Sequence, residues 1–250
     1  MIRRVLFWLL VSCFPFAADA GISKVQSTTA SGTSPALSGV VAKDFLTLTL
    51  QYILNAGASA TPTVVDSTGQ NWNVDNCPTP QGSSGAGWVG TAIFSLPNAN
   101  SGTHTITVTL AGSLVIANSM AEWSGMPITS ALDQGGATGG NTFGTTTMTV
   151  NAAGPTSQAG ELVIAVMAVE TNSGASAAIS DPPSGFTASL ALNNTWQGSG
   201  FGYEVAYQIR SSIGTPSASW SWTGSGSTLH AATLATYRGY VSTAMFFGSP

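Results

Sequence analysis

Charged side chains are scarce in this chain. They make up 6% of the 250 residues, against about 25% in an average globular protein. The six basic residues include Arg3 and Arg4 at the very start. So few cations cannot neutralise a run of phosphates, which argues against nucleic acid and against anionic membrane surfaces as partners. Because 43% of the residues are apolar and the net charge is only −4, the composition is that of a chain that folds.

Cysteine is nearly absent. The two cysteines are Cys13 and Cys77, and Cys13 lies in an N-terminal segment that we expect to be removed. No intramolecular disulfide is then expected in the mature protein, so its stability must come from its core.

Clustered metal ligands are also lacking, and we expect no cofactor. The histidines His104 and His230 lie far apart in the sequence and far from Cys77, which does not match the spacing of a zinc site. Calcium stays open, although no run of alternating Asp and Asn resembles a calcium-binding loop. The oxygen ligands in predicted turns are Asp66, Asp75, Asn76 and Asp181.

Long hydrophobic runs occur only at the N-terminus, and none approaches the roughly 18 apolar residues of a membrane span. Arg3 and Arg4 precede VLFWLLVSCFPFAA, and Ala18-Asp19-Ala20 has the small-x-small pattern of a secretory cleavage site. Residues 1–20 are therefore predicted to be a signal peptide, which places the protein outside the cell or at its surface. In an alternative reading, LVSC at 10–13 resembles a lipobox, and the protein is a lipoprotein anchored at Cys13.

Helical periodicity is missing too, and strand patterns take its place. Ile106, Val108 and Leu110 alternate with threonines, the period of a strand with one buried face. The near-continuous apolar segments 44–54 and 161–169 are typical of central strands. With turn signals every 8–12 residues, the pattern predicts an all-β sandwich. Without a strand-to-helix turn there is neither a phosphate loop nor a nucleophile elbow.

The strongest pattern is an internal repeat. Segment 103–125 returns as 216–239, each read as a hairpin, with Ile106 opposite Trp220 and Trp123 opposite Tyr237. The repeat predicts two sequence-related antiparallel β-sandwich units of jelly-roll type in tandem, closely packed. It does not decide whether they are separate sandwiches or share one. Their expected bounds are 21–127 and 128–240, followed by a C-terminal tail at 241–250.

The order of these signatures resembles repeated jelly-roll-like modules of secreted bacterial proteins, most of which have no assigned activity. The likeness covers nearly all of residues 22–240. It rests on structural motifs such as Gly-Glu-Leu at 160–162, Asp-Pro-Pro-Ser-Gly-Phe at 181–186 and the closing Tyr-Arg-Gly at 237–239. The resemblance implies the fold and export from the cell, and it assigns no catalytic residue.

Residues without a counterpart in the other unit are the candidates for function. Trp196 stands among amides in the predicted loop 193–198, and an indole flanked by amides is typical of sugar-binding surfaces. Alternatively, its ring is a cap over the end of the sandwich. The corresponding predicted loop, 73–83, would join it in one surface if both faced the same side. The predicted ligand-binding residues are Trp196, Asn193, Asn194, Gln197, Asp75 and Asn76.

These features predict a secreted, non-catalytic surface or matrix module that binds a glycan or another cell-surface polymer, or that is adhesive. The alternative is a carbohydrate-active enzyme, a glycoside hydrolase or lyase, that uses Glu122 and Glu204. Both lie in predicted strands opposite uncharged partners in the repeat. Hydrolysis requires two carboxyls about 5–5.5 Å or 6.5–9.5 Å apart. In a purely structural interpretation, both are solvated carboxylates on the sheet surface.

Cleavage after Ala20 would produce a mature chain that begins at Gly21. We expect the intact mass of the protein recovered outside the cell to match residues 21–250. A diacylated species that begins at Cys13 would replace this prediction with the lipoprotein, and a chain that keeps Met1 would contradict both.

Overall fold

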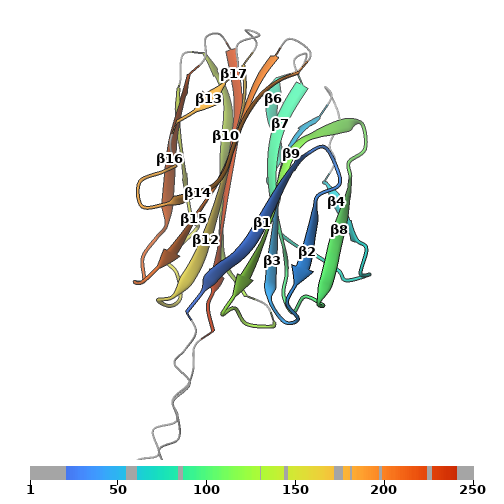
Figure 1. Ribbon diagram of the computed structural model, residues 1–250. Helices are drawn as coiled ribbons and strands as arrows, with labels where there is room; N and C mark the ends of the chain where they lie inside the picture. The colour runs from blue at the N-terminus through green and yellow to red at the C-terminus, as the bar shows by residue number, and fades with distance from the viewer. Residues whose placement is uncertain are drawn as a thin grey trace, which may run out of the picture.

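The computed structural model describes residues 21–54, 61–83, 87–129, 131–143, 146–171, 177–180, 182–196, 199–223 and 227–240. Within these ranges the protein is all-β, without a helix, and every strand pairing is antiparallel (Figure 1). The predicted fold class is confirmed. Each half of the chain forms one large and one small sheet.

In the first half, the large sheet has the order β1 (Ser23–Ser31), β9 (Ser113–Ser124), β3 (Phe45–Leu54), β7 (Gly87–Leu96), β5 (Asn73–Asn76), and β6 (Gln81–Ser83) also pairs with β7. The small sheet has the order β2 (Ala36–Val40), β8 (Gly102–Thr109), β4 (Thr63–Asp66).

In the second half, the large sheet has the order β10 (Leu132–Phe143), β17 (Ser227–Arg238), β12 (Glu161–Thr171), β15 (Ser199–Arg210), β14 (Thr187–Trp196). The small sheet has the order β11 (Thr147–Asn151), β16 (Ser217–Thr223), β13 (Ala178–Ile179). The two halves thus share one strand order, and Ile106 and Trp220 lie in the central strands of corresponding small sheets.

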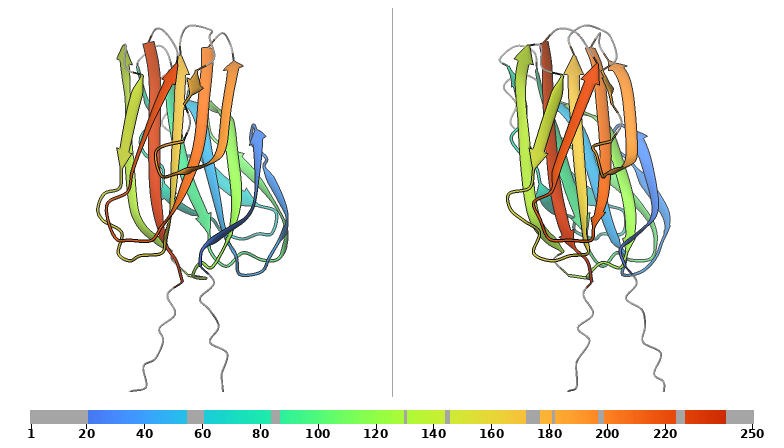
Figure 2. Two further views of the ribbon diagram at one scale, coloured as in Figure 1. Left: turned by 60° about the vertical axis from the view of Figure 1, so that its left-hand side comes forward. Right: turned by 90° about the vertical axis from the view of Figure 1, so that its left-hand side faces the viewer.

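The four sheets stack as small, large, large, small (Figure 1). Figure 2 shows that the long strands of both large sheets run roughly along one common axis. Each small sheet covers a core with its own large sheet, and a further core lies between the two large sheets. We call this last contact the central interface. The halves are therefore two sandwiches joined face to face, which answers the question that the repeat left open.

The central strands are apolar along their whole length because both faces of each large sheet are covered. On β12, Val163 and Met167 face the core of the second sandwich, whereas Ile164 and Val166 face the central interface. On β3, Leu48 faces the core of the first sandwich. A strand buried on both sides does not alternate between apolar and charged residues, as segments 44–54 and 161–169 predicted.

The small sheets alternate instead, because only one of their faces is covered. In β8, Ile106 and Val108 are buried between exposed threonines. In β16, Trp220 and Trp222 are buried between exposed serines. Both tryptophans therefore lie inside the core of the second sandwich, and Trp220 takes the place that Ile106 has in the first.

The predicted hairpins are wrong. Strand β8 pairs with β2 and β4 in the small sheet, whereas β9 pairs with β1 and β3 in the large sheet. Strands β16 and β17 are divided between sheets in the same way. Each connection crosses from one layer to the other. Periodicity reports which face of a strand is buried, and it is silent about which strand lies beside it.

A truncation in the central interface tests this stack. Ile164→Ala, at a side chain 2% exposed, should lower the free energy of unfolding by about 2–5 kcal/mol, since it removes packed methyl groups between the two sheets. Urea unfolding followed by tryptophan fluorescence measures the change.

The matched control is Ile213→Ala, at an isoleucine that is 61% exposed. It should change the stability by less than about 0.5 kcal/mol. Equal effects of the two substitutions would show that the large sheets do not pack on each other in solution.

Candidate functional site at the edge of the central interface

Hydrogen bonds as well as apolar contacts cross the central interface. The Tyr203 hydroxyl donates to Thr49 Oγ1 at 2.7 Å, and the hydroxyls of Thr91 and Thr233 bond to each other. Because these groups are buried, a shift of one large sheet over the other would leave them without partners. The interface therefore has one register.

The two lateral edges of this interface are closed by different elements. At one edge, Asn76 Nδ2 on β5 donates to the carbonyls of Gly136 and Leu234 at 2.8 and 3.0 Å, which ties β5 to β10 and β17. At the other edge, Lys24 Nζ on β1 donates to Ser189 Oγ on β14 at 3.1 Å. Since β1 and β5 are opposite edges of one sheet, β5 and β14 lie on opposite sides of the molecule.

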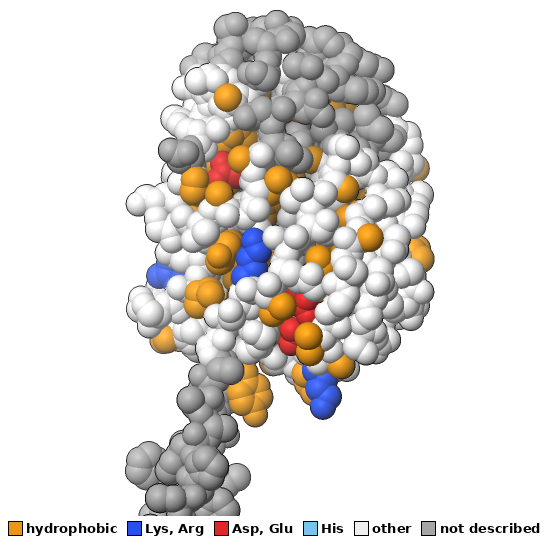
Figure 3. Space-filling model, in the orientation of Figure 1, with side chains coloured by type: hydrophobic (Ala, Val, Ile, Leu, Met, Phe, Trp, Pro, Cys, Tyr) orange, Lys and Arg blue, Asp and Glu red, His pale blue; other side chains and the backbone are white. Residues whose placement is uncertain are grey.

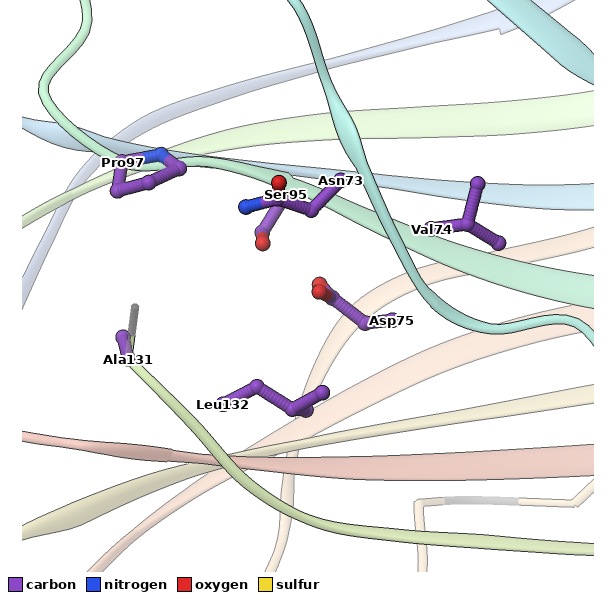
Figure 4. Close-up of a pocket in the computed structure, with 7 residues that line it drawn as sticks. All are labelled: Asn73, Val74, Asp75, Ser95, Pro97, Ala131 and Leu132. Atoms are coloured by element: carbon purple, nitrogen blue, oxygen red, sulfur yellow. The ribbon is translucent and has the colours of Figure 1, made fainter. Parts of the chain in front are cut away.

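A pocket of about 350 Å³ opens beside β5, where the two halves meet. Its wall comes from β5, from the end of β7 and from the beginning of β10. Asn73, Asp75 and Ser95 point toward a common space, whereas the side chain of Val74 points away (Figure 4). The residues that line it are Asn73, Val74, Asp75, Ser95, Pro97, Ala131 and Leu132.

Asp75 is the chemical centre of this pocket. The Tyr237 hydroxyl donates to its Oδ2 at 2.7 Å, and the Ser95 hydroxyl also bonds the carboxyl. Burial raises the pKa of Asp75 to about 6, although these two hydrogen bonds favour the ionised form. Burial and the neighbouring Asp75 charge raise the pKa of Tyr237 well above its usual value, so its phenol stays a donor. Near neutral pH the pocket therefore carries a carboxylate whose orientation is held by two hydroxyls.

The segment 73–83 is not the loop that the sequence predicted. Asp75 and Asn76 belong to strand β5, which pairs with β7, and residues 81–83 form β6. Asp75 lines the pocket, whereas Asn76 Nδ2 donates both of its hydrogen bonds across the central interface. Sequence alone misses this because a short edge strand that is followed by two prolines has the composition of a turn.

Asn193, Asn194 and Trp196 also lie in a strand. They form the end of β14, where Trp196 pairs with Ser199 of β15. Their side chains, and residue Gln197, lie outside the described residues. Because β14 and β5 are on opposite sides of the molecule, Asp75 and Asn76 do not lie beside the end of β14. Asn73, Ser95 and Leu132 were missed, since only the tertiary contact of the two halves gathers them.

Glu122 and Glu204 are not brought together. Glu122 lies on β9 next to Met120 of the first sandwich core, with Ala121 and Trp123 facing the central interface. Glu204 lies beside Met167, which faces the core of the second sandwich. The two carboxyls point away from each other, with both large sheets between them. Since packed sheets are about 10 Å apart, the pair falls outside both hydrolytic spacings.

Neither glutamate is a solvated surface group either, because both are buried. Glu122 Oε1 accepts a hydrogen bond from the Val41 backbone at 2.7 Å, and its Oε2 accepts one from Gln26 Nε2 at 2.5 Å. These bonds attach the side chain of Gln26 on β1 and the turn after β2 to strand β9 of the large sheet. A residue without a counterpart in the repeat can thus serve the fold of its own half.

Glu122 also contacts a second carboxyl. The pKa of Asp44 is raised to about 6, first by burial and then by its hydrogen bond to Glu122 and the repulsion between the two groups. At the corresponding place in the second half, Glu161 bonds the hydroxyl of Thr236. Burial raises the pKa of Glu161 as well, against the hydrogen bonds that it accepts. One position therefore holds a carboxyl pair in the first half and a carboxyl–hydroxyl pair in the second.

A further buried pair joins Asp66 to His104. His104 Nδ1 lies 2.7 Å from Asp66 Oδ2, and its Nε2 lies 2.9 Å from the Asn100 carbonyl. Both ring nitrogens therefore face an acceptor oxygen. Burial would raise the pKa of Asp66, but hydrogen bonds from His104, Thr68 and Trp72 outweigh it and lower that pKa. The cluster holds the turn after β4 against β8.

Among the described residues, no three His, Cys, Asp or Glu side chains gather into a metal-binding group. Asp66 and Asp75 already accept hydrogen bonds inside the protein, whereas Asp181 lies outside the described residues. In the part of the chain that the structure describes, no helix has the length and hydrophobicity to cross a membrane. No protein-family model matches the chain, and comparisons with curated proteins and with solved structures likewise return no match.

The Asp44–Glu122 pair predicts a stability that falls with rising pH. An ordinary Asp has a pKa of about 3.9, so the folded protein binds the Asp44 proton more tightly than the unfolded chain does. The stability therefore decreases between about pH 4 and pH 6 and stays lower above it. Asp44→Asn keeps a donor toward Glu122 at every pH, so this variant should lose the part of the decrease that comes from Asp44 and keep the parts that come from Asp75 and Glu161.

Urea unfolding of the wild type and of Asp44→Asn at pH 4.5 and pH 7.5 measures how much stability each protein loses with rising pH. At pH 7.5 the variant should be more stable than the wild type by about 1 kcal/mol, a value reduced for the partial solvent exposure of Asp44. A variant that loses as much stability with rising pH as the wild type would show that the carboxyls do not share a proton.

Proposed function

We propose that this protein is a secreted, non-catalytic surface or matrix module that binds glycans through the pocket at Asp75. The observation that supports the proposal is the composition of that pocket. A carboxylate, an amide and a hydroxyl converge on one space whose remaining wall is apolar. This combination is typical of small-ligand sites.

Each group matches a property of a sugar. The Asp75 carboxylate accepts hydrogen bonds from hydroxyls, and the Asn73 amide both donates and accepts. Pro97 and Leu132 supply apolar surface, against which the C–H face of a pyranose ring packs. Because Tyr237 and Ser95 hold Asp75 in place, little side-chain entropy is lost when the ligand binds.

A binding role fits the pocket better than hydrolysis. Asp75 is the one ionisable side chain among the described residues that line it, and glycoside hydrolysis ordinarily requires two carboxyls flanking the bond. Glu122 and Glu204, the pair on which the enzyme alternative relied, face separate cores. The pocket therefore has the acceptor that a lectin-like site uses and lacks the partner that a hydrolase needs.

The surface supports a role outside the cell. Uncharged polar side chains and backbone dominate the face shown in Figure 3, with few scattered charges. The exposed faces of β8 and β16 carry rows of threonine and serine. Such a surface meets a hydrated polymer without strong charge repulsion. The predicted signal peptide, or the alternative anchor at Cys13, would deliver it there.

The test is retention on immobilised polysaccharides. Asp75→Asn should weaken the retention of the polysaccharide that binds the wild type by about tenfold or more, because a hydrogen bond to a charged acceptor contributes roughly 1.5–3 kcal/mol. The matched control is Asp133→Asn, which changes a carboxylate next to Leu132 whose Oδ2 accepts a hydrogen bond from the Ser157 backbone. It should bind like the wild type.

Trp196→Ala separates the pocket from the hairpin of β14 and β15. If retention is lost in this variant and kept in Asp75→Asn, the binding site is the hairpin and the pocket proposal is wrong. If no polysaccharide retains the wild type, the protein is not a glycan-binding module.

A further inference from the structure

The size of the pocket limits what it can hold. At about 350 Å³, it lies at the lower end of the 300–1,000 Å³ typical of small-molecule sites. Its walls come from three elements that belong to both halves. A cavity of this size takes one ring. An internal residue of a polysaccharide needs room for a neighbouring sugar on each side, whereas a terminal residue needs room for a neighbouring sugar on one side only.

The charge of the pocket limits the ligand further. Asp75 lines it directly, and Arg238, whose Nη2 donates to the Leu132 carbonyl at 3.3 Å, is not among the residues that line it. On the neighbouring strand β10, Asp133 accepts a hydrogen bond from the backbone of Ser157. Because Asp75 is the one ionisable side chain among the described residues that line the pocket, a ligand carboxylate beside it would be repelled, since two carboxylates at close range repel each other.

The remaining acceptor capacity of Asp75 suggests how a sugar is held. An ionised carboxyl has about four lone-pair sites, and the hydroxyls of Tyr237 and Ser95 occupy two of them. Two further donors can be accepted. Adjacent hydroxyls on a pyranose ring supply two donors at fixed spacing, and the Asn73 side chain points into the same space as Asp75 (Figure 4).

We propose that the pocket holds the terminal residue of a neutral glycan, with two adjacent ring hydroxyls donating to the Asp75 carboxylate. This inference rests on the proposed glycan-binding function and names the ligand class of the same site. Asn73 bonds a third polar group of the ring. Tyr237 and Ser95 act as positioning residues, because they hold the carboxylate in the orientation that the two hydroxyls meet.

The experiment is a titration of isotopically labelled full-length mature protein followed by ¹H–¹⁵N NMR. The probes are the methyl glycosides of glucose, galactose and mannose, and the methyl glycosides of the matching uronic acids, which differ only by a carboxylate at C6. At least one neutral glycoside should shift the amide signals of Ser95, Asp75 and Leu132 with saturation. Its uronic acid partner should bind at least about tenfold more weakly.

The variants are chosen so that loss of fold is not mistaken for loss of the site. Asp75→Asn should abolish the shifts, and Tyr237→Phe and Ser95→Ala should weaken binding by a smaller factor while the melting temperature shows that each variant is folded. Equal affinity for the neutral and uronic acid glycosides would overturn the inference. So would unchanged binding by folded Asp75→Asn.

Failure of this inference is distinguishable from failure of the proposed function. Retention of the wild type on a polysaccharide, with no glycoside shifting the pocket signals, would overturn the terminal-residue inference and leave glycan binding in place. Absence of retention on every polysaccharide, together with absence of shifts, would overturn both.

Discussion

The packing of the two large sheets against each other is the constraint on which the rest of the molecule depends. Each sandwich by itself would expose one face of its large sheet, with Phe45 and Trp123 on the first and Leu162 and Tyr237 on the second. Apolar faces of this size are unfavourable in water. Joining the faces buries them. Strands β3 and β12 then lie in the middle of their own sheets and are covered on both faces. Either half alone would therefore lack the core that the two large sheets form between them.

This same contact creates the pocket. Strand β5 is short, four residues against the twelve of β10 and β17, so it covers only part of the edge that it faces. Asp75 lies on this strand and lines the pocket. Its hydrogen bond from Tyr237 closes the interface, and its position on the pocket wall presents a carboxylate to a ligand. Asp75 therefore has two roles. It accepts a hydrogen bond that joins the two halves, and it is the candidate ligand-binding group.

The few ionisable groups of this protein act largely inside it. Asp44 with Glu122, Glu161 with Thr236, and Asp66 with His104 each attach a turn or edge strand to a sheet. Inside a protein such bonds are stronger than at a surface, and unpaired groups there are costly. The outer faces of the small sheets are left with threonine and serine, whose hydroxyls are hydrated without charge. The few ionisable side chains are thus found largely inside the protein, and the outer faces are polar without them.

The sequence by itself determined what depends on local pattern. Alternation at Ile106 and Val108, the apolar segments 44–54 and 161–169, and the buried Trp220 and Trp222 all follow from which face of a strand avoids water. Tertiary structure alone decided which strands are neighbours. It divided each expected hairpin between two sheets and directed Glu122 and Glu204 into separate cores. It also placed Asp75 beside Ser95 and Leu132, because contacts between distant segments depend on how whole sheets pack, and no short segment carries that information.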